Sequence, residues 1–251
     1  MIFTIARNEL RRMFYSPLAW AVLAIVLFIL GLMFLIFVEN FVNEIQTRFA
    51  GQKSAPGVTD SVVAPLFLWA GVIMLAVSPL LTMRAFSEER QRETLTLLTS
   101  APVSITEIVL GKYLGLLLFI VVMLGLIMLM PLGLITGTSL DWGKIAAGLL
   151  GLFLLLASFA AAGLYLSSLT ATPLIAAAGS FGLLLFLVVL YISGNSQGEA
   201  SELFIYLSHF GHFLSFLEGL FDSSDLVYYL LFIAGFIVLT IRHLDNRRLQ
   251  G

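Results

Sequence analysis

Two histidines near the C-terminal end of the sequence have the spacing of metal ligands. His209 and His212 lie three positions apart, so they share one face if the segment is helical. Zinc binds imidazole nitrogens together with carboxylate oxygens, and Glu218, Asp222 and Asp225 follow in the sequence. Two histidines without a fixed third ligand do not define a site. We therefore predict no metal, and interpret His209 and His212 as histidines near the membrane interface that make local hydrogen bonds.

A second chemical candidate is the serine in Gly179-Ser180-Phe181-Gly182. An intramembrane serine protease exposes its nucleophile between glycines and needs a histidine partner. The order here differs from the usual Gly-x-Ser-Gly arrangement, and both histidines lie in a predicted outer loop. The sequence therefore disfavours a protease, and replacing Ser180 with Ala is expected to leave activity intact.

The chain is not expected to bind ATP or to be an enzyme. Neither Gly111-Lys112 nor Gly143-Lys144 has the upstream glycine and the following Ser or Thr of a phosphate-binding loop. Cys is absent from the sequence, which excludes disulfides and thiolate metal sites. We predict no cofactor in this chain.

These residues belong to a chain with the composition of a membrane protein. Of its 251 residues, 60% are hydrophobic and 11% are charged. A helix needs about 20 apolar residues to cross a membrane. We predict an all-α fold over residues 1–251, a single transmembrane domain with spans at 17–38, 61–83, 113–137, 145–169, 174–194 and 226–241.

Positive charges set the predicted orientation. Ten Lys and Arg residues lie in the N-terminus, the 84–112 loop and the tail after Ile241, whereas Arg48, Lys53 and Lys144 lie on the opposite side. The positive-inside rule then places both termini in the cytoplasm and the segments 39–60 and 195–225 outside. We predict a multi-pass protein of the bacterial inner membrane.

None of the predicted spans contains Asp, Glu, Lys or Arg. Charges retained inside a span usually mark proton relays or ion sites. Their absence argues against a proton-coupled transporter, although a stand-alone channel, a secondary transporter or a membrane scaffold for a cytoplasmic partner stays open. If the chain moves a cargo, we expect another polypeptide to supply the energy.

Residues 1–16 have the pattern of an amphipathic helix on the inner membrane surface. The polar face carries Arg7, Asn8, Arg11 and Arg12, and the other face carries Ile2, Phe3, Ala6, Leu10, Met13 and Phe14. The alternative is a plain basic flank that only sets the topology.

The segment MRAFSEERQRETLTLLTSAPVSITEIVLGK at 83–112 holds eight of the chain's 28 charged residues. Ser87 is predicted to cap a helix with Glu88 and Glu89 in its first turn. Ser104 and Glu107 have the spacing of a capping box, which predicts a second helix that continues into the third span. A helix, break, helix element of this kind suits docking into the groove of a partner.

This segment resembles the loop of ABC-2 type transporter permeases, and the start and end of the chain look most similar to the gliding-motility (GldF-like) branch, with the NosY-like branch second. The resemblance implies a permease dimer, with a second identical copy as the expected partner. Each copy would bind one cytoplasmic ATPase that holds ATP and Mg. An auxiliary extracytoplasmic protein and membrane lipid are further expected partners, and nucleic acid is not.

The resemblance also implies which residues couple the permease to its ATPase. They are Ser87, Glu88, Glu89, Arg90, Arg92, Glu93, Thr94, Leu95, Ser104, Glu107, Gly111 and Lys112. It further implies short re-entrant or interfacial helices in the outer segment 195–225. There Phe204, Leu207, Phe210, Phe213, Leu214 and Leu217 share a face, for which ordinary packing against the bundle is the alternative.

Overall fold

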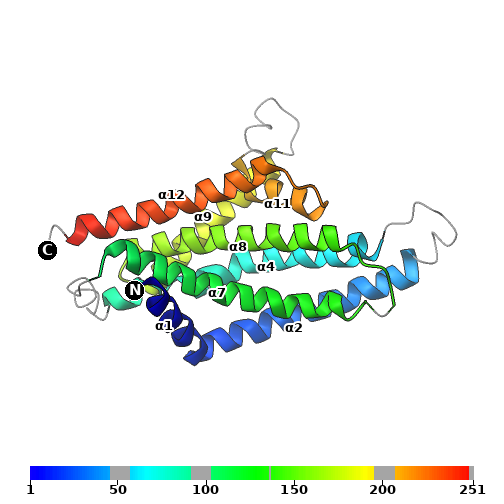
Figure 1. Cartoon of the computed structure of the whole chain (residues 1–251), viewed down its shortest axis with the longest axis horizontal. Coiled ribbons are helices and arrows are strands. Elements are labelled where there is room, and N and C mark those ends of the chain that lie inside the picture. Colours follow the sequence, from blue (N-terminus) through cyan, green and yellow to red (C-terminus); the bar gives the residue numbers. More distant parts are fainter. Residues whose placement is uncertain (46–56, 92–102, 136, 195–206, 249–251) are drawn as a thin grey trace.

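The described part of the chain is helical. A computed structural model describes residues 1–45, 57–91, 103–135, 137–194 and 207–248, and no strand occurs among them. The all-α prediction is thus confirmed for these residues. The elements, in chain order, are α1 (Ile2–Tyr15), α2 (Pro17–Asn40), η1 (Phe41–Ile45), η2 (Thr59–Val63), α4 (Ala64–Thr82), α5 (Ser87–Gln91), α7 (Ile105–Leu132), α8 (Trp142–Leu169), α9 (Pro173–Gly194), α11 (His209–Leu217) and α12 (Ser223–Arg248) (Figure 1).

Six helical stretches are long and apolar enough to cross a membrane, as predicted. They are Pro17–Asn43, Thr59–Gln91, Ile105–Leu132, Trp142–Leu169, Pro173–Tyr191 and Ser223–Arg247. The third stretch begins at Ile105, before the predicted residue 113, because the helix opens at a capping box ahead of its apolar part. The last helix extends to Arg248, beyond the predicted residue 241, because it continues into the charged tail.

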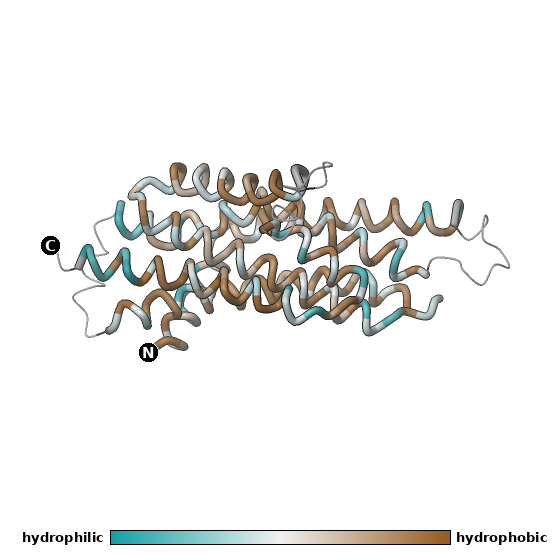
Figure 2. The backbone as a smooth tube through the Cα atoms, turned by 90° about the horizontal axis from the view of Figure 1, so that it is seen from above, coloured by the Kyte–Doolittle hydropathy of each residue, from teal (hydrophilic) through white to brown (hydrophobic). Residues whose placement is uncertain are grey.

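Successive long helices run in opposite directions, so both termini lie at one end of the bundle, on the left in Figure 1. We call this the terminal end; it also holds α1, α5, the start of α7 and the turn between α8 and α9. The opposite, distal end holds η1, η2 and the start of α8, whereas α12 begins nearer the middle of the bundle (Figure 1). Hydrophobic residues dominate the middle of the long helices, and hydrophilic residues gather toward both ends (Figure 2).

Helix α8 forms the centre of the bundle. It packs against α4, α7, α9, α11 and α12. Every residue from Leu154 to Leu164 is buried. Small residues allow the neighbours to approach closely, since a Cβ added at Gly151 would lie 2.5 Å from the Cβ of Phe216.

Helix α1 crosses the long helices at a steep angle and packs on the start of α7 (Figure 1). A Cβ added at Gly111 would lie 2.7 Å from the Cβ of Ile5, and one added at Gly115 would lie 2.8 Å from the Cβ of Glu9. The buried residues of α1 are Ala6, Glu9 and Met13. Of the predicted apolar face, Ala6 and Met13 are buried against the protein and Phe3 is 84% exposed, whereas Glu9, which the prediction assigned to neither face, is buried.

Helix α11 lies within the described part of the outer segment, and it packs against α4, α8, α9 and α12. Its Phe216 lies beside Gly151 of α8, whereas His209 stacks on Phe159. Those two positions on α8 are about 12 Å apart along the helix axis. α11 thus runs along α8 and packs against the bundle. Of the predicted apolar face, Phe210, Phe213 and Leu217 are buried, Leu214 is half-buried, Leu207 is exposed, and Phe204 lies outside the described residues.

Candidate functional site

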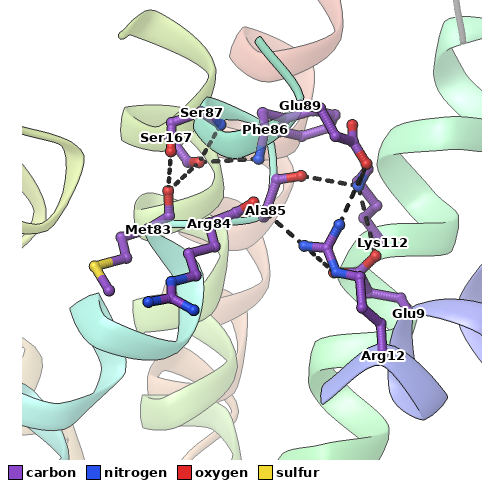
Figure 3. A network of polar contacts seen from close by, with 10 residues as sticks. All are labelled: Glu9, Arg12, Met83, Arg84, Ala85, Phe86, Ser87, Glu89, Lys112 and Ser167. Carbon is purple, nitrogen blue, oxygen red and sulfur yellow. Dashed lines mark hydrogen bonds and ion pairs between the residues drawn. The ribbon is translucent and has the colours of Figure 1, made fainter. Parts of the chain in front are cut away.

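The charged segment between α4 and α7 begins with a turn that is anchored to α8. The hydroxyl of Ser167 accepts hydrogen bonds from the backbone N–H of Phe86 at 3.0 Å and of Ser87 at 3.1 Å. It donates to the carbonyl of Met83 at 2.9 Å. Figure 3 shows these contacts, and both Ser167 and Ser87 are fully buried. One hydroxyl of α8 therefore satisfies three backbone groups that the turn leaves outside any helix.

Ser87 does not cap α5, which corrects the prediction from the sequence. It is the first residue of α5, and its own hydroxyl donates to the carbonyl of Met83. Ser167 accepts the backbone N–H of Ser87 in its place. Glu88 and Glu89 do lie in the first turn of α5, as predicted.

Arg90 ties α5 to the C-terminal end of α8. Its guanidinium donates to the carbonyl of Leu169 at 3.0 Å and to that of Ser168 at 3.4 Å. The last carbonyls of a helix lack partners within that helix and carry the negative end of its dipole, so a guanidinium there is stabilising. Arg90 therefore has an internal role in holding the segment.

Lys112 lies on the other side of the same turn, in α7 (Figure 3). Its ammonium donates to the carbonyl of Ala85 at 2.8 Å and to Glu89 Oε1 at 2.5 Å. Glu9 Oε2 lies 3.5 Å away, and the ammonium sits 5.2 Å from the centre of the Phe86 ring. The Lys112 side chain is only 3% exposed, so these contacts replace its hydration.

Arg12 completes a group of four charges that we call the charge cluster: Glu9, Arg12, Glu89 and Lys112. Its guanidinium lies 3.2 Å from Glu9 Oε1 and 3.5 Å from Glu89 Oε1, and it also donates to the carbonyl of Arg84 at 3.3 Å. The cluster holds two positive and two negative groups. It joins α1, α5 and α7 at the terminal end.

Helix α7 begins with the predicted capping box. The backbone N–H of Glu107 donates to the Ser104 hydroxyl at 3.2 Å, and the backbone N–H of Ser104 donates to Glu107 Oε2 at 3.2 Å. The N-terminal amine of Met1 lies 3.8 Å from Glu107 Oε1, which brings the start of α1 to the same place. Ser104 and Glu107 thus fix where α7 begins.

A pocket of about 460 Å³ opens between α1, α5 and the start of α7. Glu89 and Lys112 line it together with the α1 residues Thr4, Arg7, Asn8 and Arg11. Arg7 and Arg11 are exposed, so the pocket has a basic rim above the charge cluster. The predicted coupling residues Arg92, Glu93, Thr94 and Leu95 lie outside the described residues.

The two histidines do not converge on a common point. His212 Nδ1 lies 2.6 Å from Asp225 Oδ1, whereas His209 Nδ1 lies 2.9 Å from the hydroxyl of Tyr228. The His212 ring stacks on the Tyr228 ring at 4.0 Å. Within the described residues, no three His, Asp or Glu side chains gather in a way that could hold a metal. Both histidines join α11 to α12 by local hydrogen bonds.

Ser180 has no protease environment either. It is fully buried in α9, and its hydroxyl donates to the carbonyl of Ala176 at 2.7 Å within the same helix. A nucleophile would have to give up this bond and become accessible to a substrate.

Glu9 and Ser167 are the site residues that sequence reasoning missed. Glu9 is the one acidic residue within α1, and it stands three positions before Arg12. That isolated acid on the buried face of a basic helix was the available signal. Ser167 lies 80 residues from Ser87 and gave no signal, because one serine among others near the end of a span has no distinguishing pattern.

A comparison with protein families agrees with this architecture. The family of ABC-2 family transporter proteins matches residues 3–245 of the chain, from α1 to near the end of α12. No curated protein matches the chain. Because the family match covers nearly the whole chain and its six membrane-length helices, the chain belongs to the ABC-2 family of transporter proteins, as a multi-pass membrane permease.

Proposed function

We propose that this chain is the permease subunit of an ATP-driven exporter, and that its cytoplasmic ATPase docks at the terminal end. The observation that carries the proposal is the pocket beside the charge cluster. It combines the exposed Arg7 and Arg11 with the segment that resembles the coupling loop of ABC-2 permeases. An acidic or amphipathic element of a partner fits a pocket with this rim.

The orientation follows from the distribution of positive charge. The sequence segments predicted to lie on the side of the termini hold ten of the 13 Lys and Arg residues, and by the positive-inside rule this supports placing that side in the cytoplasm of a bacterial inner membrane. ATP and Mg would then be bound by the partner and not by this chain. The same proposal includes a second identical copy, an auxiliary extracytoplasmic protein and a GldF-like or NosY-like cargo system. These three parts rest on the resemblance.

The docking site is tested by removing the positive charges on the rim of the pocket. The double variant Arg7→Gln/Arg11→Gln is expected to lose the ATPase from complexes isolated in mild detergent, because it removes the exposed positive charge without filling the pocket. The measurement is the ratio of ATPase to permease after affinity purification of the permease.

The matched control is Arg242→Gln/Arg247→Gln, which removes the same charge from the exposed end of α12 at the same end of the bundle. This control should retain the ATPase. If wild-type permease carries no ATPase at all, the proposed function is wrong. If both double variants behave alike, the function stands but the docking site lies elsewhere.

A further inference from the structure

The charge cluster links segments that are far apart in the sequence. Lys112 and Glu9 are separated by 103 residues, and Lys112 and Glu89 by 23. Resting on the proposed function, we propose that Lys112 is a positioning residue that transmits movement of the segment 83–91 to α1 and α7. It does this from inside the permease and does not touch the ATPase.

Lys112 lies in the wall of the proposed docking pocket, but burial separates its ammonium from the exposed rim. Its side chain is 3% exposed and is enclosed by Ala85, Phe86, Glu89 and Glu9. By contrast, Arg7 and Arg11 on the rim of the same pocket are exposed. A partner can reach the rim directly, whereas it can affect Lys112 only by moving the groups around it.

On one side of the turn, α1 and the start of α7 form a unit. Gly111 and Gly115 let α1 approach so closely that no Cβ fits between them and the side chains of Ile5 and Glu9. Glu9 is therefore carried along when α7 moves, and its carboxylate holds both Lys112 and Arg12.

On the other side, the turn is held by α8 through Ser167 and Arg90. The hydrogen bonds of Ser167 are to backbone atoms, so they follow the turn whatever its side chains do. The segment 83–91 is thus placed between α8 and the unit of α1 and α7 (Figure 3). A displacement of the segment 83–91 must either move these helices or break the charge cluster.

Breaking the cluster is the costly alternative. Separating Glu89 from Lys112 would remove the shortest ion pair of the cluster and leave Lys112 with Glu9 as its only carboxylate, and the loss of a buried pairing is unfavourable. The buried cluster therefore resists displacement of the segment 83–91 relative to α1 and α7. An exposed ion pair would not provide this resistance.

The test separates transmission from docking. The variant Glu9→Gln/Lys112→Met removes one buried charge of each sign and leaves Arg12 paired with Glu89. The reporter is Leu214→Cys, a half-buried position that lines a pocket of about 340 Å³ at the distal end. Because the chain has no Cys, this thiol is the only one in the permease.

The complex with its ATPase is placed in lipid nanodiscs, and maleimide labelling of the reporter is timed without nucleotide and with ATP trapped by vanadate. In the wild-type background we expect the labelling rate to change on trapping. In Glu9→Gln/Lys112→Met we expect the ATPase to be retained at the wild-type ratio and the nucleotide-dependent change to be lost. The single variant Lys112→Arg, with Glu9 intact, should show the nucleotide-dependent change in labelling rate, because it keeps a cation in the cluster.

Asp245→Asn/Arg247→Met serves as the control, since it removes one charge of each sign from exposed positions on α12. It should respond to nucleotide like the wild type. Glu9→Gln alone, which keeps the pair of Lys112 and Glu89, provides a milder variant if the double substitution is not recovered folded; it should weaken the response.

Three results overturn the inference. A full response in Glu9→Gln/Lys112→Met shows that the cluster transmits nothing. Loss of the ATPase from that variant assigns Lys112 to docking. A labelling rate of Leu214→Cys that does not change with nucleotide in the wild-type background shows that the movement does not occur. Absence of an ATPase from wild-type complexes contradicts the proposed function as well, so the two failures are distinguishable.

Discussion

Lys112 shows how a membrane helix can hold a charge away from water. It lies in the third turn of α7, next to the apolar stretch that crosses the membrane. A lone ammonium would be strongly unfavourable there, so its stability depends on Glu9, Glu89 and the carbonyl of Ala85. The same dependence makes the residue sensitive to substitution.

We expect Lys112→Met to destabilise the folded permease by about 3–5 kcal/mol, because it leaves two largely buried carboxylates, Glu9 and Glu89, sharing the single cation Arg12. Glu9→Gln/Lys112→Met should cost clearly less, because it keeps the charges balanced. Thermal unfolding in detergent measures both. Equal destabilisation by the single and double variants would contradict the described pairing.

At this scale the sequence predicted only what is local. Ser104 and Glu107 are three residues apart, so the capping box could be read from their spacing, and the structure confirms it. Ser87 had the same local signal for a cap, yet Ser167 from a distant helix takes that role. The partners of Lys112 were likewise beyond prediction, because helix packing decides which distant charges meet.

Among the elements, the contact of α1 with α7 depends on the absence of side chains. The sequence indicated α1 from its amphipathic pattern, but it did not indicate that α1 packs on Gly111 and Gly115 of α7. A pattern of small residues shows that something approaches, but not which helix does.

Gly115→Ala is expected to loosen α1 from α7, since the new Cβ would lie 2.8 Å from the Cβ of Glu9. Gly125→Ala on the same helix is the matched control, because a Cβ there has no neighbour within 4 Å and Ala favours the helix by about 1 kcal/mol. Limited proteolysis within α1 should become faster only in Gly115→Ala. Equal protection of α1 in both variants would place the contact elsewhere.

Helix α11 illustrates a different limit. The sequence predicted a short apolar helix in the outer segment and left its packing open. Phe213 and Phe216 pack beside glycines of α4 and α8, so the shape of the bundle decides how far the helix enters it. The histidines then meet Asp225 and Tyr228 of α12, a pairing across two helices that could not be derived from their spacing.

For the whole molecule, the number of membrane-length helices and their alternating direction were the most predictable features. Six apolar stretches separated by turns or charged segments place both termini at one end, and the structure has this arrangement. That end also carries the charge cluster, the pocket and α1. A partner that drives the permease therefore has one extensive surface on which to act.

The central claim is that this surface receives an ATPase, and cross-linking tests it directly. Arg7→Cys at the rim of the pocket and Leu214→Cys at the distal end each introduce one thiol into a chain that has none. With a short heterobifunctional maleimide reagent in native membranes, the account predicts a cross-link from position 7 to an ATP-hydrolysing subunit and none from position 214. A cross-link to that subunit from position 214, or from neither position, would contradict it.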